Sequence, residues 1–246
     1  MLARRIIPTI LTMGTRMVKG KGFNSNRVVG HATQPFRIHQ QREVDEVCLL
    51  DVTATKEGRG PNLKLVAEIT AGFFSPLAVG GGVRSADDVR ALLRAGADKA
   101  VIGTAALDRP ELLREISDAA GAQACVVSID VKGGKVWGRS GTQPTERDPV
   151  EWAQECCDWG CGEILLNAIE RDGRMCGYDL DLIRAVTKSV DVPVIASGGC
   201  GKPEHALEAI RAGADAVATG AALLFTDYTP RDFARHLKDN GYEART

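Results

Sequence analysis

The 246-residue sequence has no long hydrophobic run, no excess of charge of either sign and no paired-cysteine motif. No run approaches the ~18 apolar residues that a membrane-spanning helix needs, so no membrane partner is expected. The apolar run after Arg4 and Arg5 ends by Thr12, which is too short for the hydrophobic region of a signal peptide. These absences predict a cytoplasmic protein.

The charge balance is close to neutral. The chain has 31 Lys and Arg residues against 32 Asp and Glu residues, a formal net charge of −1 and a pI of about 6.4. A domain that binds nucleic acid carries a clear basic excess, so no nucleic-acid partner is expected. Hydrophobic residues make up 44% of the chain, which indicates a folded globular protein rather than a disordered one.

The seven cysteines are scattered and odd in number, and none forms a C-x-x-C pair. The four histidines lie at no zinc-ligand spacing from them, so we expect no metal site and no cofactor. Cys156 and Cys157 are expected on an amphipathic helix and Cys161 on the approach to the next strand, where they pack as small hydrophobic residues. A reducing compartment is the simplest interpretation.

Short apolar runs alternate with helical patterns along the whole chain. Helical spacing is clearest over 85–95 and 203–212, and Gly96 and Gly213 end those helices. Eight strand–helix units in about 250 residues predict an α/β fold, a single (β/α)8 (TIM) barrel domain over 1–246. A doubly wound sheet would need fewer strands or a second domain, and no linker divides the chain. The predicted strands are 6–11, 46–51, 77–80, 99–102, 124–130, 163–167, 194–197 and 216–219.

The sequence repeats itself at a shift of 117 residues. Pro76-Leu-Ala-Val-Gly-Gly-Gly lies over Pro193-Val-Ile-Ala-Ser-Gly-Gly, and Arg-Ala-Gly-Ala-Asp occurs at 94–98 and again at 211–215. We therefore predict two homologous half-barrels, about 1–120 and 121–246.

Two pairs of glycine-rich loops follow the predicted strands, one pair in each half-barrel. At the carboxyl ends of barrel strands, glycines let backbone N–H groups approach an anion, and the next helix N-terminus adds a favourable dipole. Neither pair is a P-loop, because no Gly-Lys-Ser/Thr follows. The two pairs predict a long ligand with an anionic group at each end; the alternative is that the glycines only form tight turns. The loop residues are Gly82, Gly103 and Thr104 in the first half and Ser197, Gly199 and Gly220 in the second.

Four charged residues are predicted at the opposite end of the barrel. Because side chains alternate along a strand, Arg5 shares the inward face of the first strand with Leu11 but lies nearer its start. The same parity turns Glu46, Lys99 and Glu163 inward at the starts of their strands. The four charges sum to zero and are expected to meet on the barrel floor. One interpretation of the four charges is purely structural, a plug of ion pairs. Buried ion pairs add little net stability, so stability alone is a weak reason for the cluster.

A set of specific motifs is spread over nearly the whole chain, from Met1 to about Phe225. They are Arg5-Ile-Ile-Pro8, Met17-Val-Lys-Gly20, Gly80-Gly-Gly-Val83, Gly162-Glu-Ile-Leu-Leu166, Arg171-Asp-Gly173 and Ala196-Ser-Gly-Gly199. This set resembles the cyclase subunit of imidazole glycerol phosphate synthase. The resemblance implies a (β/α)8 barrel that receives ammonia from a glutaminase partner. It also implies a lyase-type reaction in histidine biosynthesis, which cleaves and cyclises a bis-phosphorylated ribulosyl aminoimidazole carboxamide nucleotide.

The resemblance also implies roles for individual residues. In the family, two aspartates act as general acid and base. This sequence keeps the one on the fifth strand, Asp130, but has Leu11 at the first-strand position, and a leucine cannot transfer a proton. Lys19 is placed in the loop after the first strand and is expected to close over the ligand. The matching residues are Arg5, Glu46, Lys99 and Glu163 for an ammonia gate, Asp98 for the glutaminase contact, and Lys19, Asp172 and Gly173 beside the two loop pairs for the ligand.

A retained ammonia gate with a lost catalytic aspartate is similar to a branch of this family in lipopolysaccharide biosynthesis, where an acetamido sugar becomes an acetamidino sugar. There the barrel conducts ammonia from a glutaminase, and a separate ATP-dependent enzyme activates the amide. We therefore predict an ammonia-conducting barrel that serves a phosphorylated or nucleotide-sugar small molecule. The alternatives are a genuine cyclase in histidine biosynthesis and a non-catalytic scaffold that activates a glutaminase.

Overall fold

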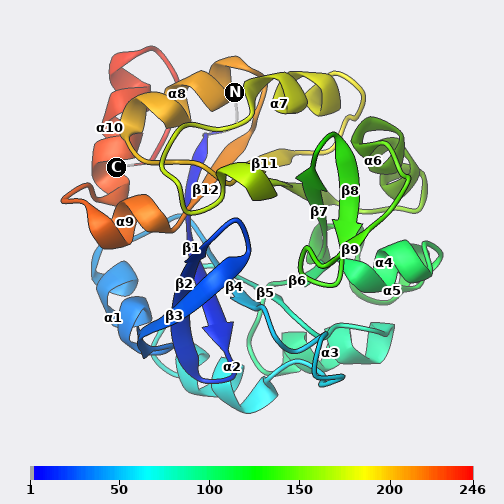
Figure 1. Ribbon diagram of the computed structural model, residues 1–246. Coiled ribbons are helices and arrows are strands. Elements are labelled where there is room, and N and C mark those ends of the chain that lie inside the picture. The colour runs from blue at the N-terminus through cyan, green and yellow to red at the C-terminus, as the bar shows by residue number, and fades with distance from the viewer. Residues whose placement is uncertain (1–2, 246) are drawn as a thin grey trace.

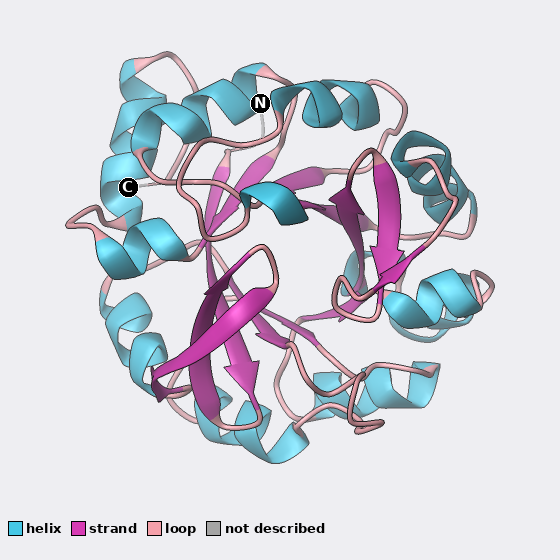
Figure 2. Cartoon of the chain, in the orientation of Figure 1, coloured by secondary structure: helices cyan, strands magenta, loops and turns pink. Residues whose placement is uncertain are grey.

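The computed structural model describes residues 3–245, and its centre is a closed barrel of eight parallel strands surrounded by helices (Figures 1 and 2). The predicted (β/α)8 fold is confirmed, and each predicted strand lies within two residues of an observed one. Met1, Leu2 and Thr246, the ends of the predicted domain, lie outside the described residues. The barrel strands are β1 (Arg5–Met13), β4 (Val47–Asp51), β5 (Leu77–Gly80), β6 (Lys99–Ile102), β7 (Cys125–Lys132), β10 (Glu163–Ala168), β11 (Val194–Ser197) and β12 (Ala216–Thr219).

The barrel closes because each of these strands has a parallel neighbour on both sides. β1 pairs with β12 and β4, while β7 pairs with β6 and β10, so the strand order runs round a complete ring. Strands of such a barrel are covered by helices outside and by side chains inside, which explains their nearly continuous apolar sequences. In β10, for example, all six residues are buried.

Helices surround the barrel and pack an apolar face against it. The third helix begins at a Ser85 cap, whose hydroxyl accepts the N–H of Asp88 at 3.1 Å. None of the helices in residues 3–245 combines the length and hydrophobicity that a membrane span needs. The helices are α1 (Gln34–Gln41), α2 (Leu63–Thr70), α3 (Ala86–Arg94), α4 (Thr104–Asp108), α5 (Leu112–Ala120), α6 (Pro149–Asp158), α7 (Leu180–Thr187), α8 (Pro203–Arg211), α9 (Ala221–Phe225) and α10 (Pro230–Asp239), with 3-10 turns η1 (Ala122–Ala124) and η2 (Ile169–Arg171).

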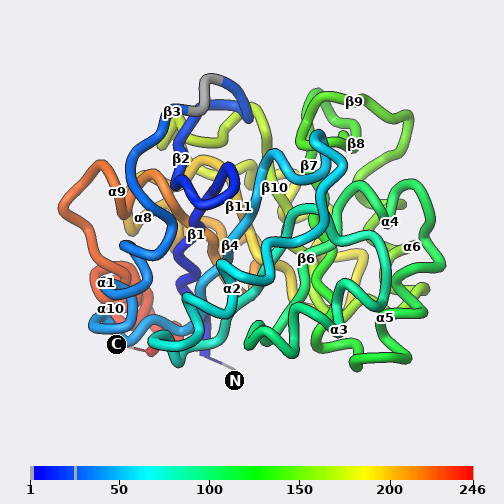
Figure 3. Tube along the Cα trace, turned by 90° about the horizontal axis from the view of Figure 1, so that it is seen from below, coloured from blue at the N-terminus to red at the C-terminus, as the bar shows by residue number. Residues whose placement is uncertain are grey.

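Two antiparallel extensions of the barrel differ from the expectation of simple loops. β1 turns back into β2 (Arg16–Lys21) and β3 (Asn24–His31), and β7 turns back into β8 (Lys135–Gly138) and the short β9 (Gln143–Pro144). Both stand above the barrel at the end opposite the chain termini (Figure 3). The dipeptide Gly133-Gly134, with φ of +58° and +73°, forms the second hairpin turn, a signal that was present in the sequence.

The barrel interior holds its own apolar layer, separate from the larger core between strands and helices. Its side chains come from all eight strands and lie between the starts and the ends of those strands. A barrel filled in this way is a packed core rather than an open pore. The buried members are Ile7, Cys48, Ala78, Val101, Val126, Leu165, Ile195, Ala216 and Ala218.

The internal repeat recurs as equivalent hydrogen bonds in the two halves. The Asp98 carboxylate accepts the N–H of Leu77 at 2.8 Å, and Asp215, 117 residues later, accepts the N–H of Val194 at 3.2 Å. In each half a threonine at the end of one helix also donates to a carbonyl at the end of the next helix. The repeated sequence therefore encodes repeated contacts.

The same two threonines explain why glycine ends α3 and α8. Gly96 and Gly213 have φ of +103° and +114°, and in both cases an added Cβ would lie 2.5 Å from the hydroxyl oxygen of a threonine, Thr70 or Thr187. We expect Gly96→Ala and Gly213→Ala each to lower the free energy of unfolding by about 1–3 kcal/mol, because both strain and a steric clash are introduced. Thermal unfolding followed by circular dichroism measures the effect.

Gly72→Ala is the matched control, because no atom lies within 4 Å of its added Cβ. Its melting temperature should stay close to that of the unchanged protein. If Gly96→Ala has the same melting temperature as Gly72→Ala, the contact with Thr70 does not determine the end of α3.

Candidate functional site

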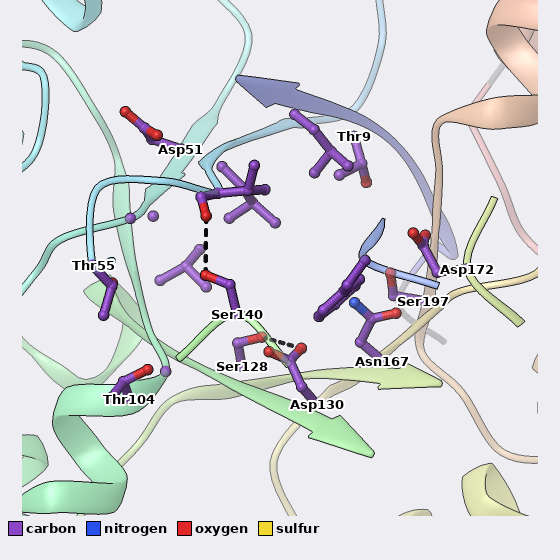
Figure 4. Close-up of a pocket in the computed structure, with 18 of the residues that line it drawn as sticks. Thr9, Asp51, Thr55, Thr104, Ser128, Asp130, Ser140, Asn167, Asp172 and Ser197 are labelled. Carbon is purple, nitrogen blue, oxygen red and sulfur yellow. Dashed lines mark hydrogen bonds between the residues drawn. The ribbon is translucent and has the colours of Figure 1, made fainter. Parts of the chain in front are cut away.

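A cavity of about 360 Å³ opens at the carboxyl ends of the barrel strands (Figure 4). Its size is that of a small-molecule site. Both glycine loop pairs reach it, although they lie about half a barrel apart in the strand order. The structure thus brings together every residue predicted to contact a ligand: Lys19, Gly82, Gly103, Thr104, Asp130, Asp172, Gly173, Ser197, Gly199 and Gly220.

Close backbone packing accounts for two of the loop glycines. An added Cβ at Gly82 would collide with the carbonyl oxygen of Arg59, and one at Gly199 would collide with that of Gly177. The turns therefore require glycine whether or not an anion binds. The anion-binding role of the loops stays a prediction.

Lys19 lies in strand β2, not in the loop that the sequence suggested. Its side chain is buried in the cavity, and its Nζ donates to the carbonyl oxygen of Thr9 at 3.3 Å. Burial lowers the pKa of Lys19 to about 8, and the nearby Asp172 carboxylate opposes this shift. The expected loop position of Lys19 is wrong, because Lys19 lies within β2 and pairs with Arg27 of β3. Its closing over a ligand stays a prediction.

Asp130 lies near the end of β7 on the polar side of the cavity. The Ser128 hydroxyl donates to its Oδ1 at 3.2 Å, and Figure 4 shows both beside Asn167, with Asp172 nearby. Burial raises the pKa of Asp130 to about 7, the hydrogen bonds from Ser128 and Asn167 lower it, and the charge of Asp172 raises it. Asp130 therefore changes its protonation near neutral pH.

The opposite wall is apolar. Leu11 lines the cavity and pairs in register with Leu50 of β4, so no carboxylate stands at the first-strand position. Three buried side-chain oxygens in the cavity have no hydrogen-bond partner among the described residues: Thr9 Oγ1, Asn167 Oδ1 and Thr219 Oγ1. Buried polar atoms of this kind normally bond to a ligand or to water. The cavity thus offers unpaired oxygens to a ligand that carries hydrogen-bond donors.

Sequence reasoning missed Ser128 and Asn167. Ser128 has the same strand parity as Asp130, and Asn167 pairs in register with Asp130 across β7 and β10. The parity rule that placed charges on the barrel floor would have found Ser128. The same rule turns Asn167 inward, since it shares the parity of Glu163, and the register between β7 and β10 was needed only to place it beside Asp130.

The four predicted floor residues meet at the opposite end of the barrel. Arg5 Nη1 lies 2.7 Å from Glu46 Oε2, and Arg5 also pairs with Glu163. Lys99 Nζ lies 2.9 Å from Glu46 and 2.8 Å from Glu163, which completes a ring. The glutamate side chains are almost fully buried, whereas those of Arg5 and Lys99 are 25% and 20% exposed. The cations thus form the outer side of a neutral ring.

Asp98, the predicted partner contact, is exposed beside Lys99. Its carboxylate accepts the N–H of Leu77, so it has a structural role at the start of β5. The contact with a partner stays a prediction.

Comparisons with known proteins agree with this geometry. The family described as histidine biosynthesis protein matches residues 5–229. The imidazole glycerol phosphate synthase subunit HisF of Dictyoglomus thermophilum is 42% identical over 250 residues, which cover 100% of this chain and 99% of that protein. The subunit of the same name from Thermobifida fusca is 44% identical, and the match covers 99% of this chain and 99% of that protein. The one from Pyrococcus furiosus is 41% identical, and the match covers 100% of this chain and 99% of that protein.

The chain belongs to the histidine biosynthesis protein family.

Membership of this family confirms the resemblance that the motifs carried. The relatives bear the name of the imidazole glycerol phosphate synthase subunit, and none of these names supports the lipopolysaccharide branch. Among the predicted functions, the family therefore favours the cyclase alternative. Leu11 is a residue of the site that departs from the pattern implied by the resemblance.

The raised pKa of Asp130 predicts a pH-dependent effect on stability. A carboxyl group with an ordinary pKa of about 3.9 in the unfolded chain and about 7 in the folded protein destabilises the fold once it ionises. The cost is absent below pH ~4, grows as the pH rises to ~7 and is complete above that. Asp130→Asn removes it, so its stabilising effect should be larger at pH 8 than at pH 5 by about 1–3 kcal/mol, measured by denaturant unfolding at both pH values.

Asp181→Asn provides the control, because the Asp181 side chain is 96% exposed. Its effect should be the same at both pH values within experimental error. An Asp130→Asn effect that does not grow with pH would contradict the buried, protonatable state of Asp130.

Proposed function

We propose that this chain is the barrel subunit of a glutamine-dependent synthase of the imidazole glycerol phosphate synthase type. In this proposal a glutaminase partner docks at the barrel floor and delivers ammonia. The barrel then uses the ammonia at its mouth on a ligand with two phosphate groups. The observation that supports the proposal is the order of three levels along one axis: the ring of Arg5, Glu46, Lys99 and Glu163, the apolar layer, and the cavity.

The apolar layer suits neutral ammonia better than ammonium. An ion that enters such a layer loses its hydration without gaining a partner, which costs far more than the same step for a neutral molecule. Cys48 does not change this property, because burial raises its pKa far above the ordinary thiol value and keeps it uncharged. The layer would therefore transmit ammonia and hold back ions.

The cavity contains two groups that titrate near neutral pH. Asp130, with a pKa of about 7, and Lys19, with a pKa of about 8, line the same cavity, and the charge of Asp172 acts on both. An ionised carboxylate and a charged amine can serve as general base and general acid. Leu11 removes one aspartate, but it does not leave Asp130 as the sole proton-transfer group. This favours the cyclase reaction.

A second candidate is the acetamidino-sugar branch, in which the barrel conducts ammonia toward a nucleotide-sugar whose amide an ATP-dependent enzyme activates. The observation that favours it is Leu11, since the wall that it forms with Leu50 is apolar where the family chemistry uses a carboxylate. The third possibility, a scaffold that only activates a glutaminase, requires no chemistry in the cavity.

Turnover of the bis-phosphorylated ribulosyl aminoimidazole carboxamide nucleotide with free ammonium, followed by loss of substrate absorbance, tests the proposal. We expect turnover that Asp130→Asn abolishes and that is at least ~10²-fold slower than that of a relative with both aspartates. Leu11→Asp should raise the rate, whereas Leu11→Asn, of similar size and polarity, should not. No turnover by the unchanged protein would refute the cyclase proposal, and turnover of an acetamido nucleotide-sugar in the presence of the activating enzyme would then support the second candidate.

The pH dependence of kcat/KM tests separately whether Asp130 and Lys19 transfer protons in the reaction. The free enzyme should be most active with Asp130 ionised and Lys19 protonated, so the profile should be a narrow bell with limbs at about pH 7 and pH 8. Lys19→Arg, which keeps the charge but titrates far higher, should remove the alkaline limb. A profile that stays flat from pH 6 to 9 would exclude both groups from the rate-limiting proton transfer.

If the ring is an ammonia gate, Lys99→Ala should uncouple glutamine hydrolysis from product formation in the complex. Removing Lys99 opens the outer side of the ring, so ammonia can escape and more glutamate should form for each molecule of product. Because Lys99 is 20% exposed, the loss of stability should stay below the ~3–5 kcal/mol typical of a fully buried pair. The measurement counts glutamate and product in one sample of the complex with the glutaminase.

Lys188→Ala, on the outer surface, is the charge-matched control. An unchanged glutamate-to-product ratio with a collapsed melting temperature would identify the ring as a structural plug. Glutamate formation without any product, in the unchanged complex, would identify the chain as a scaffold.

A further inference from the structure

Lys19 reaches the far half of the barrel. It lies in β2, the hairpin strand that follows the first strand of the first half-barrel, yet its Nζ lies against Gly220, at the end of the last strand of the second half. This is possible because β1 and β12 are neighbours in the closed ring. The β1–β2 hairpin thus places the cation of Lys19 beside the glycine loops of the other half.

The second hairpin stands in the equivalent place. β8 pairs with β7, the first strand of the second half, and β7 lies beside β6, the last strand of the first half. Leu11 pairs with Val18 across the first hairpin, and Asp130 pairs with Trp137 across the second. In this register Gly138 corresponds to Lys19. Gly138 has no side chain, but the next residue is an arginine.

Arg139 contacts the glycine loops of the first half-barrel. Its backbone N–H donates to the Thr104 hydroxyl oxygen at 2.8 Å, and its side chain lines the cavity. With φ of +50°, Arg139 lies in the left-handed region that non-glycine residues rarely adopt. The Ser140 hydroxyl, one residue on, donates to the Val52 carbonyl oxygen at 3.1 Å and so ties this segment across the cavity to the loop after β4. The backbone of Arg139 is therefore held in place, while its side chain is half-exposed.

The guanidinium of Arg139 has only weak competition for an anion. Its Nε donates to Gln143 Oε1 at 2.6 Å, and its Nη2 lies 3.6 Å from Asp108 Oδ2. The side chains of this ion pair are 50% and 57% exposed, and exposed pairs at such distances contribute little. Thr104 accepts the backbone N–H of Arg139, which leaves its own hydroxyl proton free to donate. A hydroxyl donor thus lies beside the backbone of Arg139, whose guanidinium is held only by Gln143 and Asp108 among the described residues.

We propose that Arg139 is the side-chain ligand for a phosphate-type anion at the loops of Gly82 and Thr104, as the counterpart of Lys19 at the loops of Ser197 and Gly220. This proposal rests on the proposed function, because it requires that the first loop pair binds an anion. A guanidinium holds two phosphate oxygens at once in a planar fork, which an ammonium cannot do. The two ends of the cavity would then recognise their anions differently, and Arg139 would determine which end of the ligand lies over β6.

Titration of the isotopically labelled protein with inorganic phosphate, followed by amide NMR, tests this inference site by site. The amides of Gly82 and Thr104 report one end, and those of Ser197 and Gly220 report the other. We expect Arg139→Gln to weaken phosphate binding at the first end by about fivefold or more and to leave the second end unchanged. Arg139→Lys, which keeps the charge but not the fork, should fall between the two. Arg184→Gln, an exposed arginine on α7, removes the same charge as a control.

The outcomes are distinguishable. If the unchanged protein binds phosphate at Gly82 and Thr104 but Arg139→Gln binds it equally well there, the role of Arg139 is wrong and the proposed function stands. Equal weakening at both ends would show a general change in the cavity and would also overturn the inference. If the unchanged protein shows no phosphate response at Gly82 and Thr104, the anion site of the proposed function fails, and Arg139 fails with it.

Discussion

The closed ladder of parallel strands is the constraint on which the rest of the structure depends. Once β7 pairs with β10 and completes the ring, every second side chain of each strand must point into a narrow interior. Those side chains can occupy only a few levels, and the register between strands decides which residues share one level. The floor charges, the apolar layer and the polar mouth are three consequences of this one closure.

Electrostatics differ between the two ends of the barrel. At the floor, two cations and two carboxylates neutralise one another, so burial is compensated within the ring. At the mouth, Lys19 is buried and Asp130 half-buried, neither with a full ion-pair partner, and the pKa values of both move toward neutrality. The mouth therefore holds groups that can exchange protons near neutral pH. The proposed function relies on this contrast between the two ends.

The duplication of the half-barrel also has a chemical consequence. Equivalent strands end in equivalent glycine loops, and each first strand carries a hairpin that leans over the neighbouring last strand of the other half. Each half therefore completes the cavity of the other. The halves have diverged where they contact the ligand: a buried lysine stands at one end and a half-exposed arginine at the other, and Leu11 faces Asp130 across the cavity.

The sequence alone determined the strands, the repeat and the level of each inward residue, because those follow from local periodicity and from matching segments. Arg5, Glu46, Lys99 and Glu163 could be placed on the floor in this way, and the loop glycines and Asp130 could be placed at the mouth. The hairpins were not predicted. The Gly133-Gly134 turn of the second was a signal in the sequence, whereas β2 shows no alternation, because Met17, Val18 and Lys19 are buried in succession. Only the tertiary structure decided that Lys19 is buried, that Asn167 lies beside Asp130 and that Arg139 lies on Thr104. Each of these depends on which distant strands become neighbours when the barrel closes, and no local pattern in the chain records that pairing.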